Sequence, residues 1–145
     1  MTLKSISMAA TAVLVVVVVG LFLRHELFAT GPVAMAVQGV AVLLMVWARL
    51  SFGLRSFHAG ANPTEGGLVT KGPYGFVRHP IYAAILLFLW AGFTSHISVT
   101  TIVAVGVASA ALAVRMFTEE RLMTERYPEY REYAARTKRV IPFVL

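Results

Sequence analysis

Two long apolar stretches near the start of the chain limit what it can fold into. Residues 8–23 are apolar apart from Thr11, and residues 33–50 carry Gln38 in the middle and Arg49 near the end. A helix that crosses a bilayer needs about 20 mostly apolar residues. Of the 145 residues, 58% are hydrophobic, and the mean hydropathy is +0.74. Because a soluble domain of this size has too little interior for so many apolar side chains, we predict an integral membrane protein.

Two further apolar segments follow a long polar connection. Pro80 suits the first turn of a third helix that extends to about residue 93, and a fourth helix is predicted from about residue 98 to residue 117. The third helix is short, so the two are expected to form a hairpin. Beyond residue 117 the chain is polar. It carries three tyrosines at three-residue spacing, Tyr127, Tyr130 and Tyr133. This spacing predicts an amphipathic surface helix.

The predicted fold is therefore an all-α membrane protein with about four transmembrane helices, the last two a hairpin, and a C-terminal amphipathic helix. We expect one domain of four parts: the two N-terminal spans (1–50), a polar loop (51–79), the hairpin (80–117) and the tail helix (118–145). Gln38 is interpreted as a polar residue that hydrogen-bonds a neighbouring helix.

The positive charges predict the orientation of these spans. Twelve of the thirteen lysines and arginines lie near the N-terminus, in or next to the connection between the second and third spans, or from the end of the fourth span onward; only Arg24 lies on the other side. Since cytoplasmic segments of membrane proteins are enriched in Lys and Arg, we predict that both termini and the long loop are cytoplasmic. The loop and the tail would then face the same water and could meet.

Composition argues against several functional classes. The chain has no cysteine, so it offers no disulfide, thiolate zinc site or thiol nucleophile. No acid and histidine cluster has the spacing of metal ligands, so no metal site is predicted. The net charge of +6 fits contact with anionic membrane lipids better than nucleic-acid binding, because no nucleic-acid recognition motif is present. Residues 8–23 also resemble a signal peptide, but the remaining chain would still need a membrane.

The first candidate for chemistry is the run Arg78-His79-Pro80-Ile81-Tyr82. Pro80 opens the third helix, and the free backbone N–H groups of a first helical turn form an anion site. His79 would sit at the mouth of this site, with Tyr82 one turn inside. The alternative is that Arg78 only anchors the helix at the membrane edge and that His79 only caps it.

The second candidate is the acid pair Glu119-Glu120 at the end of the fourth predicted span. Adjacent carboxylates repel each other and are unfavourable near a helix C-terminus, so a ligand role is a reasonable hypothesis. They could bind an ammonium or sulfonium group or the diol of a ribose. Alternatively, they are solvated acids that pair with nearby arginines.

Arg115 lies one turn deeper in the same predicted helix, four residues before Glu119. An arginine at membrane depth is energetically costly and needs a partner. That partner could be an anionic substrate group, Glu119 itself, or a lipid phosphate reached by snorkelling. The tail tyrosines are expected to pack the tail helix against the membrane or the loop.

Together, the anion-binding turn and the acid pair would suit a zwitterionic ligand. S-adenosylmethionine carries a carboxylate, an ammonium, a sulfonium and a ribose, and is complementary to such a site. Spacing alone does not select it over other small zwitterions.

Residues 68–82, which read Leu-Val-Thr-Lys-Gly-Pro-Tyr-Gly-Phe-Val-Arg-His-Pro-Ile-Tyr, are followed by Glu119-Glu120 and by a tyrosine-rich tail that ends Thr-Lys-Arg-Val-Ile-Pro at residue 142. This pattern resembles the isoprenylcysteine carboxyl methyltransferase family, and related phospholipid methyltransferases share parts of it. The resemblance covers roughly residues 64–145. It implies a membrane enzyme that uses S-adenosylmethionine to methylate a lipophilic acceptor entering from the bilayer.

The resemblance also implies roles for individual residues. Arg115 matches an arginine assigned to the methyl acceptor, and His79 is the nearest candidate base for an amine acceptor, so these two are the candidate catalytic residues. The candidate cofactor-binding residues are Gly67, Leu68, Val69, Tyr74, His79, Pro80, Ile81, Tyr82, Glu119 and Glu120.

Three alternatives stay open from the sequence. The acceptor could be an isoprenylcysteine-like carboxylate, another small lipid, or the amine of a phospholipid. The chain could be a non-catalytic membrane scaffold whose loop binds lipid head groups. It could also be a membrane reductase with a nicotinamide cofactor, although it lacks a dinucleotide phosphate cradle. A homo-oligomer is a further option if a second protomer completes the acceptor tunnel.

Overall fold

The computed structural model describes residues 2–53 and 68–141, and within these ranges the chain is built from helices. Their order and bounds are α1 (Leu3–Leu23), α2 (Pro32–Phe52), the short 3₁₀ helix η2 (Gly72–Gly75), α3 (Pro80–Ser95), α4 (Val99–Arg126) and α5 (Tyr130–Arg136). The prediction of an all-α protein is confirmed.

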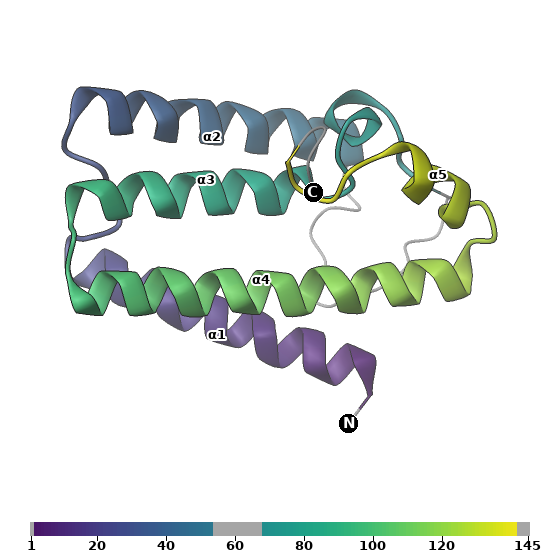
Figure 1. Cartoon of the computed structure of the whole chain (residues 1–145), viewed down its shortest axis with the longest axis horizontal. Coiled ribbons are helices and arrows are strands. Elements are labelled where there is room, and N and C mark those ends of the chain that lie inside the picture. Colours follow the sequence, from purple (N-terminus) through teal and green to yellow (C-terminus); the bar gives the residue numbers. More distant parts are fainter. Residues whose placement is uncertain (1, 54–67, 142–145) are drawn as a thin grey trace.

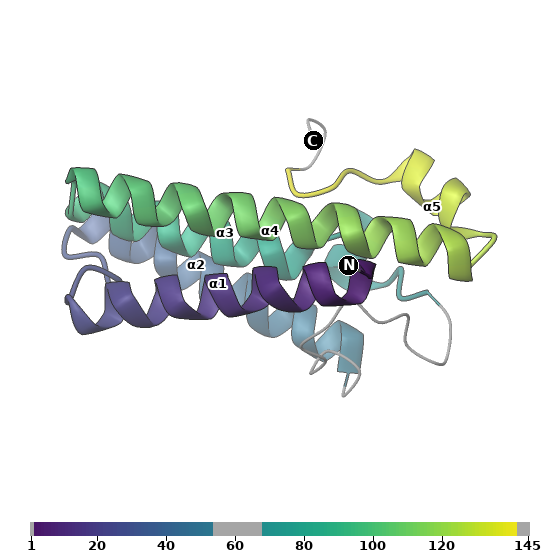
Figure 2. The same ribbon diagram turned by 90° about the horizontal axis from the view of Figure 1, so that it is seen from below.

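The long helices pack as two pairs, α1 against α4 and α2 against α3 (Figures 1 and 2). The connections between α1 and α2 and between α3 and α4 lie at one end of the bundle. The start of α1, the end of α2, η2, the start of α3, the end of α4 and α5 all lie at the opposite end. The described ends of the polar loop, residues 51–53 and 68–79, therefore lie at the same end of the bundle as α5, as predicted.

Three helices in the described part of the chain are long and apolar enough to cross a membrane, namely α1, α2 and α4. Their outer faces carry exposed apolar side chains such as Val16 and Leu43, both 70% exposed. This is the surface expected of helices in contact with lipid. The third predicted span, α3, has 16 residues, which corresponds to about 24 Å against a hydrocarbon core of about 30 Å. The predicted count of four spans therefore stays a prediction.

The structure corrects the predicted boundary between the hairpin and the tail. The fourth helix does not end at residue 117, and the tail is not one helix from residue 118. Instead α4 continues to Arg126, and α5 has only seven residues. Residues 118–126 contain no glycine or proline, so nothing stops the helix there; Pro128 then disfavours helical backbone at Tyr127, where α4 ends. Glu119 and Glu120 therefore lie inside α4 rather than at its C-terminus, and the helix-dipole argument against them does not apply.

Gln38 ties the helices together at the end of the bundle opposite the tail. Its side-chain oxygen accepts from Ala29 N at 2.9 Å, and its Nε2 donates to Leu27 O at 3.0 Å and Phe88 O at 3.1 Å. The predicted hydrogen bond to a neighbouring helix is confirmed, because Phe88 belongs to α3. Arg24 lies at this end too, where it pairs with Glu26 at 2.9 Å.

Gly92 allows α3 to approach this connection, which gives a direct test of the packing. A Cβ at Gly92 would lie 2.5 Å from Leu27 O, whereas a Cβ at Gly106 in α4 would meet nothing within 4 Å. We expect Gly92→Ala to lower the free energy of unfolding by about 1–3 kcal/mol, as overpacking does, and Gly106→Ala to leave it unchanged or slightly higher. Thermal unfolding of both variants in the same detergent measures the difference. Equal stability of the two variants would contradict this packing.

Candidate functional site

The start of α3 and residues 115–120 of α4 meet in one cluster of charged and hydrogen-bonding side chains. Tyr82, in the first turn of α3, donates its hydroxyl to Glu119 Oε1. Its ring packs with Leu112 and Met116 of α4, and Leu14 of α1 lies against them. The two segments that the sequence analysis combined therefore lie in direct contact, although they are 37 residues apart in the chain.

Arg115 is the buried cation of this cluster. It is 7% exposed, and its Nε donates to the Tyr82 hydroxyl at 2.9 Å while its Nη2 donates to Glu119 Oε1 at 2.9 Å. Of the three partners predicted for Arg115, the structure shows Glu119. It also shows a partner that was not predicted, Tyr82. A buried charge needs such a partner, so the contact with Glu119 offsets part of the cost of burying the Arg115 guanidinium.

His79 lies between the two acids. Its Nε2 is 3.2 Å from Glu120 Oε1, and its Nδ1 is 3.9 Å from Glu119 Oε2. The imidazole stacks on the Tyr82 ring with a centroid distance of 5.3 Å and an interplanar angle of 5°. The histidine therefore contacts every acid of the cluster and has little freedom to rotate.

Glu120 joins three parts of the chain. One oxygen accepts from Arg78 Nε at 2.9 Å, and the other accepts from Arg139 Nε at 3.1 Å. Arg78 also donates from Nη1 to the carbonyls of Ala134 and Thr137. Arg78 is thus a buried clamp between α4, the start of α3 and the tail, rather than an anchor at the membrane edge.

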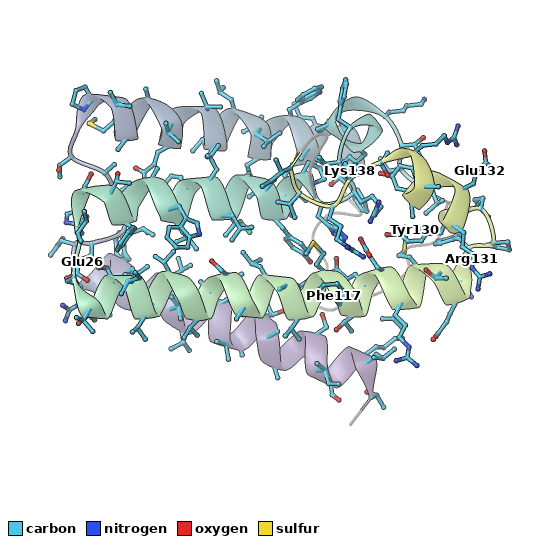
Figure 3. All side chains as sticks on the ribbon, viewed as in Figure 1. Glu26, Phe117, Tyr130, Arg131, Glu132 and Lys138 are labelled. Carbon is cyan, nitrogen blue, oxygen red and sulfur yellow. The ribbon has the colours of Figure 1, made fainter. Side chains whose placement is uncertain are left out.

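The tail after α5 runs beside the segment that precedes α3. Val77 and Lys138 form an isolated parallel bridge. Arg78 N donates to Lys138 O at 2.7 Å, and His79 N donates to Arg139 O at 2.9 Å. Because His79 N and the proline nitrogen are then unavailable, the anion site expected at the start of α3 retains only the N–H groups further into the turn. Figure 3 shows Lys138 and Tyr130 at this end of the bundle and Glu26 at the other.

Tyr133 packs the tail onto the loop, as predicted, and the Tyr130 ring lies beside it at a centroid distance of 5.9 Å. Both are buried, and Tyr133 donates its hydroxyl to Tyr74 O at 2.7 Å. Burial raises the pKa of Tyr133 to about 12 and also raises the pKa of Tyr74. Tyr127 has a different place, since it caps the end of α4.

Of the remaining predicted cofactor residues, some lie at the charged cluster and others lie away from it. Pro80 is buried as the first residue of α3, and Ile81 packs against the cluster around Tyr82. Leu68 and Val69 lie in the segment before η2, and Tyr74 in η2 is bonded to α5 rather than to the acids. Gly67 lies outside the described residues. Gly72 begins η2 with a φ of +59°, where a Cβ would meet the side chains of Ser51 and Trp47 of α2.

Three contacts of the cluster were not predicted from the sequence, namely those of Thr11 with Arg115, of Arg78 with Glu120 and of Arg139 with Glu120. Arg78 is next to His79 and could have been included on that ground. Thr11 is the single hydroxyl in an apolar run of sixteen residues, which is a usable signal. Arg139 gives no local signal, because its contact with Glu120 depends on the path of the tail.

The contacts of the described residues define a class of protein. It is an all-helical integral membrane protein with a charged cluster of two carboxylates, three arginines and a histidine at one end of its helices. Within residues 2–53 and 68–141, no group of three or more His, Cys, Asp or Glu side chains is arranged to hold a metal ion.

Residues 27–130 match the phospholipid methyltransferase family, and the chain belongs to this family. The match begins after α1 and ends at the start of α5. It includes the start of α3 and the acid pair of α4. The chain is thus a membrane protein of a methyltransferase family, and no solved structure matches it.

Two curated relatives are similar over part of the chain. The cobalt-zinc-cadmium resistance protein CzcN of Cupriavidus metallidurans is 39% identical over 77 residues, which cover 52% of this chain and 35% of that protein. The nickel-cobalt-cadmium resistance protein NccN of Alcaligenes xylosoxydans xylosoxydans is 34% identical over 86 residues, which cover 58% and 39%. The matched part is thus little more than a third of the length of either relative.

Proposed function

We propose that this chain is an S-adenosylmethionine-dependent methyltransferase that acts on a lipophilic acceptor within the membrane. The observation that carries the proposal is the contact between the start of α3 and the pair Glu119-Glu120 at one end of a membrane bundle. The family match adds the reaction class. The positive charges gathered at the same end support a cytoplasmic position for the cluster and both termini.

The side chains of the cluster fit the charges of the cofactor. The Glu119 and Glu120 side chains are 22% and 14% exposed, so they are screened from water but still reachable. They suit the ammonium group and the ribose diol, while His79 and the N–H groups of the first turn of α3 suit the carboxylate. These acidic and basic groups bond to each other. A bound zwitterion would therefore replace some of these internal partners with its own groups of the same charge.

When it is bound, S-adenosylmethionine supplies a methyl group on a positively charged sulfur. The chain's own residues would hold the reactants and exclude water. Arg115 lies at the deep side of the acids, toward the apolar parts of α1, α3 and α4, where it could bind an anionic acceptor group. The surrounding apolar helices exclude water. The charges of the sulfonium and of an anionic acceptor, which disappear in the reaction, are therefore not stabilised by solvent before it. A carboxylate acceptor needs no base, whereas an amine acceptor would transfer a proton to His79.

Methyl transfer from labelled cofactor is the direct test. We expect purified protein in lipid nanodiscs to move the tritiated methyl group of S-adenosylmethionine into the organic phase when N-acetyl-S-farnesylcysteine is supplied as a carboxylate acceptor. The ester formed releases labelled methanol in mild base. A second candidate, favoured by the family to which the chain belongs, is methylation of the phosphatidylethanolamine amine, which gives a base-stable product.

The proposal would be overturned by a specific result. If calorimetry shows no binding of S-adenosylmethionine at millimolar concentration, and neither acceptor nor a whole membrane lipid extract gains label, the chain is not a methyltransferase of this kind. Binding of lipid head groups without cofactor binding would then favour the scaffold alternative, and binding of a reduced nicotinamide would favour the reductase.

A further inference from the structure

One face of α1 carries two hydroxyl groups, although the helix lies outside the family match, which begins at residue 27. Ser7 and Ala10 are buried on this face, and Leu14 packs on the Tyr82 cluster. These residues and Thr11 share one side of the helix, because their spacing of three and four residues corresponds to one helical turn. The opposite side carries exposed valines, for example Val16. α1 therefore turns the hydroxyl groups of Ser7 and Thr11 toward α4 and exposed valines such as Val16 toward lipid.

Thr11 reaches the buried arginine from this face. Its hydroxyl donates to Ser7 O at 2.9 Å, and its Oγ1 accepts a hydrogen bond from Arg115 Nη1. Because the hydroxyl proton is committed to Ser7, the oxygen presents a lone pair to the guanidinium. The pair bridges 104 positions of the chain.

The guanidinium of Arg115 is thereby held on three sides by three helices. Nε bonds Tyr82 of α3 and Nη2 bonds Glu119 of α4, each at 2.9 Å, while Nη1 bonds Thr11 of α1. A planar guanidinium with three fixed edges cannot turn about its own axis. Loss of the bond to Thr11 would remove the contact that ties this edge of the guanidinium to α1, so the group could rotate or shift toward the acids.

We propose that Thr11 is a positioning residue for Arg115, and that α1 completes the site instead of serving only as a membrane anchor. The proposal deepens the proposed function, since it takes Arg115 as the group that meets the methyl acceptor. Thr11 itself touches neither reactant. Its contribution is to fix the direction in which Arg115 presents its charge.

The test compares three variants of the full chain in nanodiscs. Thr11→Val keeps the shape of the side chain and removes the hydroxyl, whereas Thr11→Ser keeps the hydroxyl. Thr94→Val is the matched control, because Thr94 lies near the far end of α3 and its hydroxyl also donates to a carbonyl of its own helix, that of Ala91. The two measurements are methyl-transfer kinetics and the ¹⁵N NMR signals of the Arg115 guanidinium, assigned with Arg115→Lys.

We expect Thr11→Val to lower kcat for the acceptor about tenfold or more, in line with the loss of a hydrogen bond to a charged group, while its Kd for S-adenosylmethionine stays within about twofold of wild type. The two Nη signals, separate in the wild type, should merge in Thr11→Val as the guanidinium begins to rotate. Thr11→Ser should behave like the wild type in both measurements, and so should Thr94→Val.

The proposal is wrong if Thr11→Val keeps separate Nη signals, or if Thr11→Ser fails as completely as Thr11→Val. An equal loss of rate in Thr94→Val would show a general effect of removing helix hydroxyls and would also overturn it. If the wild type itself transfers no methyl group, the proposed function fails, and the NMR comparison alone still decides whether Thr11 positions Arg115.

Discussion

Replacing Glu119 with glutamine is expected to weaken the binding of S-adenosylmethionine at least 30-fold, or about 2 kcal/mol, and to abolish detectable methyl transfer. Removing one partner of a hydrogen-bonded charge pair typically costs about 2–5 kcal/mol of binding free energy. Glutamine keeps an oxygen that can accept from Tyr82 and Arg115, which both bond Glu119 Oε1. The change therefore removes the charge while keeping most of the local packing.

The same substitution also touches stability, because Arg115 loses its carboxylate. The Glu119 side chain is 22% exposed, so water moderates the effect, and we expect a loss of about 1–2 kcal/mol in the free energy of unfolding. Thermal unfolding with and without cofactor separates the two effects. A ligand at 100 times its Kd stabilises a protein by about 2.7 kcal/mol, and this increment should fall to about 0.9 kcal/mol or less in Glu119→Gln at the same cofactor concentration.

Glu125→Gln is the matched control on the same helix. Glu125 pairs with Arg121 at 3.6 Å, and both side chains are more than half exposed. An exposed pair contributes about 0–1 kcal/mol, so this variant should keep wild-type stability, cofactor affinity and activity. If Glu119→Gln binds cofactor as tightly as Glu125→Gln does, Glu119 is a structural partner of Arg115 and not part of a cofactor site.

The helices were largely predictable from the sequence because each has a local physical cause. Runs of about 20 apolar residues require a membrane helix, and Pro32 and Pro80 suit the first turns at which α2 and α3 begin. The boundary at residue 117 failed because a change from apolar to polar side chains ends the membrane span, not the helix. Only a backbone signal such as Pro128 ends α4.

The cluster was predicted in outline because its main parts lie in two short, unusual runs, Arg78–Tyr82 and Glu119-Glu120. The contacts of Thr11 and Arg139 with these runs could not be predicted in the same way. Both depend on tertiary packing: α1 must turn one face to α4, and the tail must return beside residues 76–79. No local spacing encodes contacts of this kind.

Replacing Arg78 with methionine is expected to have a second large effect, a loss of stability where the tail docks on the bundle. The Arg78 side chain is 8% exposed and bonds Glu120 Oε1 at 2.9 Å, Ala134 O at 2.8 Å and Thr137 O. Methionine has similar length but no donor, so Arg78→Met leaves a carboxylate and two carbonyls without this partner. We expect a loss of about 3–5 kcal/mol in the free energy of unfolding, as for other broken buried pairs.

Hydrogen exchange should localise this loss to the tail. The amides of Arg78, His79 and Lys138 bond across the parallel bridge, and in Arg78→Met they should exchange at least tenfold faster, because about 1.4 kcal/mol of lost local stability corresponds to a factor of ten. Ala29, whose amide bonds Gln38 at the far end of the bundle, should keep its protection. Arg78→Lys should recover little, since an ammonium on a flexible stem cannot match three acceptors in a fixed fork.

Arg136→Gln controls for the loss of one positive charge from the tail. Arg136 pairs with Glu132 at 3.5 Å within α5, and both side chains are more than 70% exposed, so its removal should change stability by less than about 0.5 kcal/mol. Unchanged exchange at Arg78, His79 and Lys138 in Arg78→Met would show that the tail is held by its buried tyrosines alone. Selective loss in Arg78→Met, with cofactor affinity falling in parallel, would instead mean that the docked tail keeps Glu120 and His79 in the positions that the cofactor needs.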